Sequence, residues 1–321
     1  MNEKLSRPQF NQMDTTEKQT LMESLAARYN MTFLDLHTFD RWGQSSTTGI
    51  FEKDGRKFVF VPGDTVTLGW EQFAVGLNQE SREELDYLFQ EWEMEPQNPE
   101  EMIRESMAPV RQAAIGPMLV GRELEEINWE PVKMDDPRLT AHPDWLKEFR
   151  DFAWSDSSSL TLHQSARIER TEDGFQTWIY NRTDYDALLA RLEKQGLSLP
   201  TADEWAYLCG GGCRTLFPWG DGLDYSMRLR WFEDMDEDEN RPYDMEEPNF
   251  FGLSIAYDPY MREVVQADRL TTCGCNICGG LGPFLGFLPC SPHCKPEVQE
   301  DNELNGDYDF YRPIIRLENY D

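Results

Sequence analysis

The run 199–208 constrains local structure more strongly than any other part of this chain. It reads Leu-Pro-Thr-Ala-Asp-Glu-Trp-Ala-Tyr-Leu. Thr201 and Glu204 have the spacing of a capping box, in which each side chain accepts a backbone N–H at the start of a helix. Pro200 stands just before that start. The run 217–221, Phe-Pro-Trp-Gly-Asp, then predicts a tight aromatic turn after the helix.

A second pattern, at 58–69, is typical of a β-hairpin. Its first half is a β-branched and aromatic run, its middle is Pro62-Gly63-Asp64, and its second half alternates in polarity. A further hairpin is expected from Arg167 to Tyr180 around an Asp-Gly turn, followed by a helix that begins at Thr183 or Asp184. The chain therefore mixes strands and helices.

The chain resembles the formylglycine-generating enzyme family, also called sulfatase-modifying factors, in four places. They are the run 58–69, the run 199–208 with 217–221, Asn-Phe-Phe-Gly-Leu at 249–253 and the last strand at 310–317. The motifs occur in the family's order from about Gly49 to the C-terminus. The resemblance implies an α+β protein with a C-type-lectin-like fold, whose sheet is irregular and mixed.

The resemblance also implies a domain organisation. Residues 1–48 are expected to form an N-terminal helical extension, and residues 49–321 the sulfatase-modifying-factor-like domain. A helical insertion is predicted at about 78–107. Capping boxes are expected at Asp14 with Glu17 and at Ser81 with Glu84, and Asn98-Pro99 is expected to start another helix. The periodicity of the insertion favours core packing over a cover for the substrate face.

Composition excludes several classes of partner. The net charge is −30, from 30 basic and 60 acidic residues, so nucleic acid and anionic membranes would be repelled. The acidic run 233–240 is interpreted as a solvated loop, with a basic partner as the alternative. No segment has the ~20 apolar residues of a membrane span, and the first residues lack a signal-peptide core. We expect a cytoplasmic protein, and no nucleotide-binding motif is present.

The seven cysteines are the main chemical signal. An odd number in a cytosolic protein argues against a complete disulfide framework. Five lie late in the chain: Cys273, Cys275 and Cys278 form C-x-C-x-x-C, and Cys290 and Cys294 enclose His293 in C-x-x-x-C. Thiolates at such spacing suit Zn²⁺ or Cu(I). Tight packing of small side chains in a Gly-rich loop is the alternative.

The resemblance implies roles for the last pair. Family oxidases use two cysteines near the end of the chain to bind Cu(I) and engage a substrate cysteine, and Cys290 and Cys294 occupy a similar place. Cys273, Cys275 and Cys278 are then a candidate zinc or structural site. Where the family has a calcium motif, Asp258 and Glu263 are either calcium ligands or surface carboxylates.

Two functions follow from these assignments. One is a copper-dependent oxidase that converts a cysteine of a peptide or protein substrate to formylglycine. The alternative is a catalytically silent, lectin-like module that binds a protein or a small ligand and carries a structural metal site.

Overall fold

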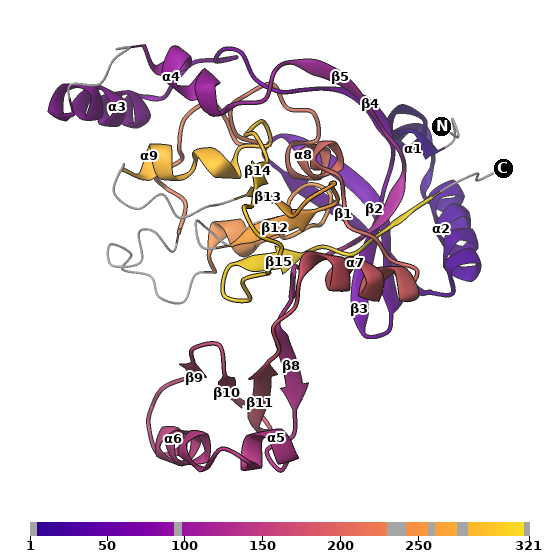
Figure 1. Ribbon diagram of the computed structural model, residues 1–321. Helices are drawn as coiled ribbons and strands as arrows, with labels where there is room; N and C mark the ends of the chain where they lie inside the picture. Colours follow the sequence, from indigo (N-terminus) through magenta and orange to yellow (C-terminus); the bar gives the residue numbers. More distant parts are fainter. Residues whose placement is uncertain (1–4, 93–97, 230–241, 256–260, 275–281, 318–321) are drawn as a thin grey trace.

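The computed structural model describes residues 5–92, 98–229, 242–255, 261–274 and 282–317. Within them, the central element is an antiparallel sheet in the order β1-β2-β3-β6-β16 (Figure 1). Its strands are β1 (Thr32–Arg41), β2 (Gln44–Lys53), β3 (Arg56–Val61), β6 (Met118–Gly121) and β16 (Ile314–Arg316). The last strand of the chain therefore closes a sheet that begins near the N-terminus.

Both faces of this sheet are buried. On β3, Phe58 and Phe60 belong to one hydrophobic core, and Val59 and Val61 belong to another. Because neighbouring residues of a strand point to opposite faces, a continuous apolar run is required here. The first core includes residues of α1 (Arg7–Gln12), α2 (Thr15–Tyr29) and α7 (Tyr185–Lys194), and the second includes those of α8 (Ala202–Gly210).

A second sheet, which is mixed, packs beside α8. Its order is β14-β13-β12-β15-β7, with β12 and β15 parallel. The strands are β7 (Glu125–Glu126), β12 (Arg262–Val265), β13 (Thr271–Gly274), β14 (Glu297–Val298) and β15 (Asp309–Tyr311). A two-stranded ribbon pairs β4 (Asp64–Leu68) with β5 (Arg111–Ile115).

Helices cover the upper end of the body in Figure 1. They are α3 (Gln79–Glu91), α4 (Pro99–Ser106) and α9 (Pro283–Gly286), followed by the short 3-10 turn η5 (Leu288–Cys290); another such turn is η3 (Asp244–Glu246). Leu85, Leu88 and Phe89 of α3 share a core with Phe284 and Phe287. The prediction that the insertion contributes to a core is therefore confirmed for α3.

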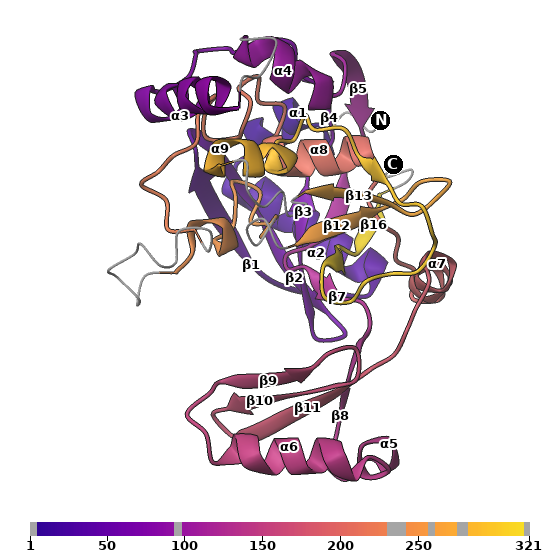
Figure 2. The same ribbon diagram turned by 60° about the vertical axis from the view of Figure 1, so that its left-hand side comes forward.

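Residues 129–180 form a unit that stands apart from the body in both views (Figures 1 and 2). We call it the projecting unit. Its antiparallel sheet has the order β8-β11-β10-β9, and a small core of its own includes Phe149, Phe152 and Ile168. The elements are β8 (Trp129–Val132), α5 (Pro137–Thr140), α6 (Pro143–Ala153), β9 (Ser159–Leu162), β10 (Ala166–Thr171) and β11 (Gly174–Tyr180).

One buried ion pair joins the two sheets of the body. Arg312 lies between β15 and β16 with no exposed surface, and its guanidinium is 3.1 Å from the Glu263 carboxylate on β12. It also donates to the backbone oxygens of Gly121 at 2.6 Å, of Arg122 at 3.0 Å and of Ser254. Burial raises the pKa of Glu263, and the adjacent Arg312 opposes that rise. The interpretation of Glu263 as a surface carboxylate is therefore wrong, since it is 1 % exposed.

Several sequence predictions are confirmed. Thr201 with Glu204 and Asp14 with Glu17 form the expected capping boxes. The helix starts at Asn98-Pro99 and Asp184 and the hairpin of β10 and β11 are also as expected. The chain is α+β. Residues 1–48 contain α1, α2, β1 and half of β2.

Two further predictions are wrong. The strands around Pro62-Gly63 exist, but β3 pairs with β2 and β6 whereas β4 pairs with β5. The backbone of Gly63 instead exchanges hydrogen bonds with Leu5 and Arg7, so the N-terminal segment occupies the place of a hairpin partner. The cap of α3 is Asn78 rather than Ser81, which is buried within the helix.

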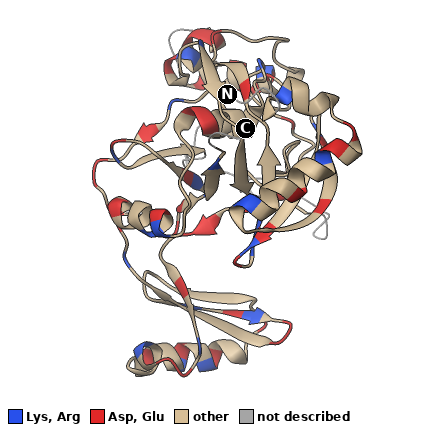
Figure 3. Ribbon diagram, turned by 90° about the vertical axis from the view of Figure 1, so that its right-hand side faces the viewer, with Lys and Arg blue, Asp and Glu red and all other residues tan. Residues whose placement is uncertain are grey.

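Acidic residues are spread over the body and the projecting unit (Figure 3). No helix in the described part of the chain is both long and apolar enough to cross a membrane.

Replacing Arg312 with Met should lower the free energy of unfolding by about 3–5 kcal/mol, because the buried Glu263 carboxylate loses its counter-charge. Urea denaturation of the parent and variant measures the difference. Arg138→Met is the matched control, since the Arg138 ion pair with Glu130 is 48 % exposed on both sides and an exposed pair contributes little to stability. Equal losses in the two variants would show that the buried pair does not hold the sheets together.

Candidate functional site

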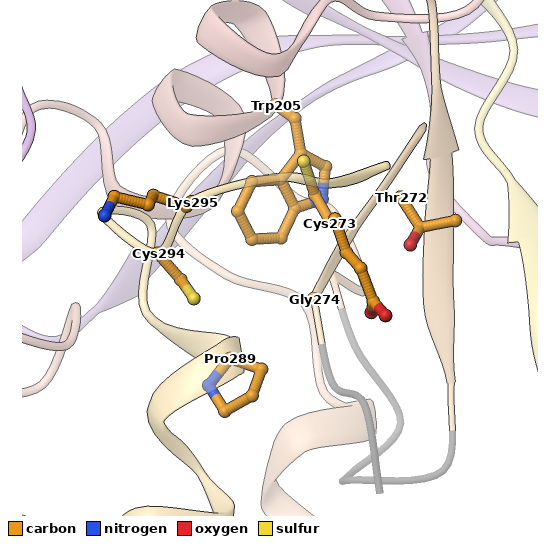
Figure 4. A pocket seen from close by; sticks show the side chains of 8 residues that line it. Trp205, Thr272, Cys273, Gly274, Pro289, Cys294 and Lys295 are labelled. Atoms are coloured by element: carbon orange, nitrogen blue, oxygen red, sulfur yellow. The ribbon is translucent and has the colours of Figure 1, made fainter. Parts of the chain in front are cut away.

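A pocket of about 170 Å³ lies where α8, β13 and the segment after η5 meet (Figure 4). Two thiols, an indole ring, a lysine stem and a carboxylate contribute to its walls. The lining residues are Trp205, Thr272, Cys273, Gly274, Pro289, Cys294, Lys295 and Glu297. Figure 4 shows Cys273 and Cys294 with the Trp205 ring between them in that view.

The Cys273 side of the pocket is rigidly placed. Cys273 is opposite Glu263 in the β12–β13 pairing, and it is 6 % exposed. Trp205 lies one residue beyond the capping box of α8, in which Glu204 also forms an ion pair with Arg316 at 2.5 Å. The local sequence signal at Thr201 and Glu204 therefore orients the ring that borders the pocket.

The Cys294 side of the pocket is held by hydrogen bonds to the last residue of α4 and to the segment that follows it. The amide of Ala108 donates to the His293 oxygen at 2.8 Å, and the Cys294 thiol donates to the Ser106 oxygen at 3.6 Å. His293 itself is 1 % exposed. Its Nε2 lies 3.0 Å from the Thr215 oxygen, which can only accept, so Nε2 carries the proton. Burial lowers the pKa of His293 to about 4, and the ring is neutral at pH 7.

Among the residues that the structure describes, four cysteines carry thiols: Cys209, Cys213, Cys273 and Cys294. Burial raises the pKa of Cys209 and of Cys273 well above the ordinary value, and raises that of Cys213 to about 12. The nearby Glu263 and Cys294 add to the rise at Cys273. The Cys273 thiol is therefore protonated at neutral pH, and a bound cation would favour its thiolate.

The predicted copper pair is not brought together as two thiols. Cys290 is 3 % exposed and disulfide-bonded, whereas Cys294 lines the same pocket as Cys273. Cys275 and Cys278 lie outside the described residues, as does Asp258. Copper binding by Cys290 and Cys294 stays a prediction, as does a zinc or structural site at Cys273, Cys275 and Cys278.

Cys273 and Cys294 belong to different cysteine clusters of the sequence, and no local pattern singles out this pair. Among the described residues, no group of three or more His, Cys, Asp or Glu side chains is arranged for a metal ion. A two-coordinate Cu(I) site needs only two soft ligands, and the Cys273–Cys294 pair fits that requirement in donor type.

Two further motif residues, Asp221 and Asn249, are buried and form hydrogen bonds to the backbone. Asp221 of the aromatic turn is 1 % exposed and accepts the backbone N–H groups of Leu216, Val75 and Gly76. Asn249 is also buried and donates to the Leu208 oxygen at the end of α8. These side chains fix loops around α8 and do not line the pocket.

No family model matches the chain, and no curated protein matches it.

Iodoacetamide should modify Cys294 at least about tenfold faster than Cys209, Cys213 and Cys273 in the native protein at neutral pH. Cys209 and Cys273 are buried, and the raised pKa of Cys213 leaves little thiolate. Mass spectrometry of peptides after timed exposure gives the four rates. Protein unfolded in urea is the control, in which the rates should converge. Faster modification of Cys273 or Cys213 would contradict the geometry of the pocket.

Proposed function

We propose that the chain is a divergent sulfatase-modifying-factor-like protein with a C-type-lectin-like fold, and that its pocket binds Cu(I) and oxidises the cysteine of a peptide or protein segment. One observation carries the proposal: two cysteines that are not in disulfides, Cys273 and Cys294, line the same pocket. The motifs at 199–208, 217–221 and 249–253 support the family assignment through their resemblance.

The residues have separate parts in this proposal. Cys273 and Cys294 hold the metal ion as soft thiolate ligands. Cu(I), when bound, supplies the one-electron chemistry that activates oxygen. Trp205 and Pro289 restrict water at the site, and Lys295 and Glu297 present charges at its edge.

The overall reaction balances with an external thiol as reductant. A peptide CH₂–SH group and O₂ take up two protons and two electrons, and give an aldehyde, H₂S and water. Two molecules of a small thiol supply the electrons and protons as they join in a disulfide. The C–S bond of the substrate breaks, and its carbon is oxidised.

A binding module without catalysis is the second candidate. The disulfide at Cys290 favours it, because a late cysteine that the family resemblance assigned to copper has a covalent structural use here. In this alternative the pocket binds a ligand and the thiols take no part in chemistry.

Anaerobic titration of the reduced protein with Cu(I), against a competing chelator, tests the first candidate. The parent should bind one equivalent, and Cys273→Ser and Cys294→Ser should each weaken binding at least about 100-fold, because a single thiolate remains. Cys213→Ser is the matched control, since Cys213 does not line the pocket, and should bind as the parent does.

The outcomes separate the two candidates. Loss of binding in both pocket variants supports the copper site, and oxygen uptake with a cysteine peptide then tests catalysis. Cu(I) binding that is unchanged in Cys273→Ser and Cys294→Ser would contradict the oxidase and favour the binding module.

A further inference from the structure

A second and larger pocket adjoins the thiol pocket. Its volume is about 510 Å³, and Lys295 lines both pockets. Its apolar walls come from Trp70, Met107, Pro109 and Val110. Because Val110 is 44 % exposed while Trp70 is 2 % exposed, the pocket has a buried wall and an open rim. A ligand that enters at the rim can place an apolar group against the indole.

Lys295 connects the two pockets through its length. Its stem borders the thiol pocket, and Figure 4 shows its ammonium group extending away from Cys273. The ammonium donates one hydrogen bond to the backbone oxygen of Glu105 at 2.7 Å. An ammonium has three N–H groups, so this bond anchors it and leaves donors for a ligand.

The larger pocket contains a second cation. The Nε of Arg104 donates to the backbone oxygen of Glu71 at 3.0 Å, which holds the plane of the guanidinium while its terminal N–H groups stay available. Glu71 is the acidic side chain among the lining residues, against the two cations Arg104 and Lys295. Glu297, which lines the smaller pocket, is the second carboxylate of the combined lining. The two cations therefore lie together in the larger pocket, whose lining contains one carboxylate.

The two cations and the apolar wall together favour a ligand that carries both a carboxylate and an apolar group. The cations suit a carboxylate, and the apolar wall suits a hydrocarbon side chain. Lys295 also lines the smaller pocket, which contains Cys273 and Cys294. A carboxylate bound to Lys295 would therefore lie beside a substrate cysteine in that pocket.

We infer that the two pockets form one groove for an extended peptide segment, in which an Asp or Glu near the reacting cysteine binds Lys295 and Arg104 and a neighbouring apolar side chain packs on Trp70. The inference rests on the proposed function for the position of the cysteine. It adds a substrate class, acidic cysteine segments, to that function.

Fluorescence anisotropy with labelled cysteine peptides tests this substrate class without copper. Each peptide carries a Leu and an Asp, with the Asp at successive positions on either side of the cysteine, and has a partner in which Asn replaces the Asp. At the preferred position the Asp peptide should bind about tenfold more tightly than its Asn partner, and added salt should reduce the difference.

The variants identify the groups that bind the carboxylate. Lys295→Gln and Arg104→Gln should each remove most of the preference for Asp, and Lys295→Glu should reverse it. Lys147→Gln on α6 is the control, because Lys147 is an exposed lysine of the projecting unit. Circular dichroism verifies that each variant is folded.

The experiments distinguish failure of the peptide groove from failure of the oxidase. Equal binding of the Asp and Asn peptides at every position, or a preference that survives Lys295→Gln and Arg104→Gln, would overturn the groove even if the protein oxidises cysteine peptides. A preference for Asp in a protein that shows no copper-dependent oxidation would retain the groove and reject the oxidase.

Discussion

The buried contact between Arg312 and Glu263 is the constraint on which the body of this protein depends. Both charges are withdrawn from water, and such a pair is tolerated only when hydrogen bonds satisfy the remaining donors. Arg312 meets that condition through three backbone oxygens as well as the carboxylate. Since these oxygens belong to segments far apart in the chain, the guanidinium fixes the mutual position of the two sheets. The strand β13, which carries Cys273, is aligned by its pairing with the strand of Glu263.

The chemistry of the candidate site follows from this arrangement. A rigid strand presents one thiol in a buried position, and a segment held by backbone bonds after α4 presents the other. Burial keeps Cys273 protonated in the absence of a cation. Burial therefore makes Cys273 the less reactive of the two thiols that line the pocket.

The features that could be predicted from sequence are local. The caps at Thr201, Asp14, Asn98 and Asp184 depend on residues within one turn of each other, so their spacing alone is informative. Features that depend on distant residues could not be predicted. The separation of β3 from β4 depends on the N-terminal segment at Leu5 and Arg7. Likewise, the pocket depends on residues from α8, β13 and the segment after η5, which no single motif contains.

The projecting unit has a consequence for how this chain could have been assembled. Its first and last strands are hydrogen-bonded neighbours, with Trp129 opposite Tyr180, so the polypeptide leaves the body and returns to it at adjacent points. A short turn could bridge that gap at little entropic cost. Residues 129–180 therefore have the topology of a cassette that can be gained or lost in evolution while the frame that holds the thiols stays intact.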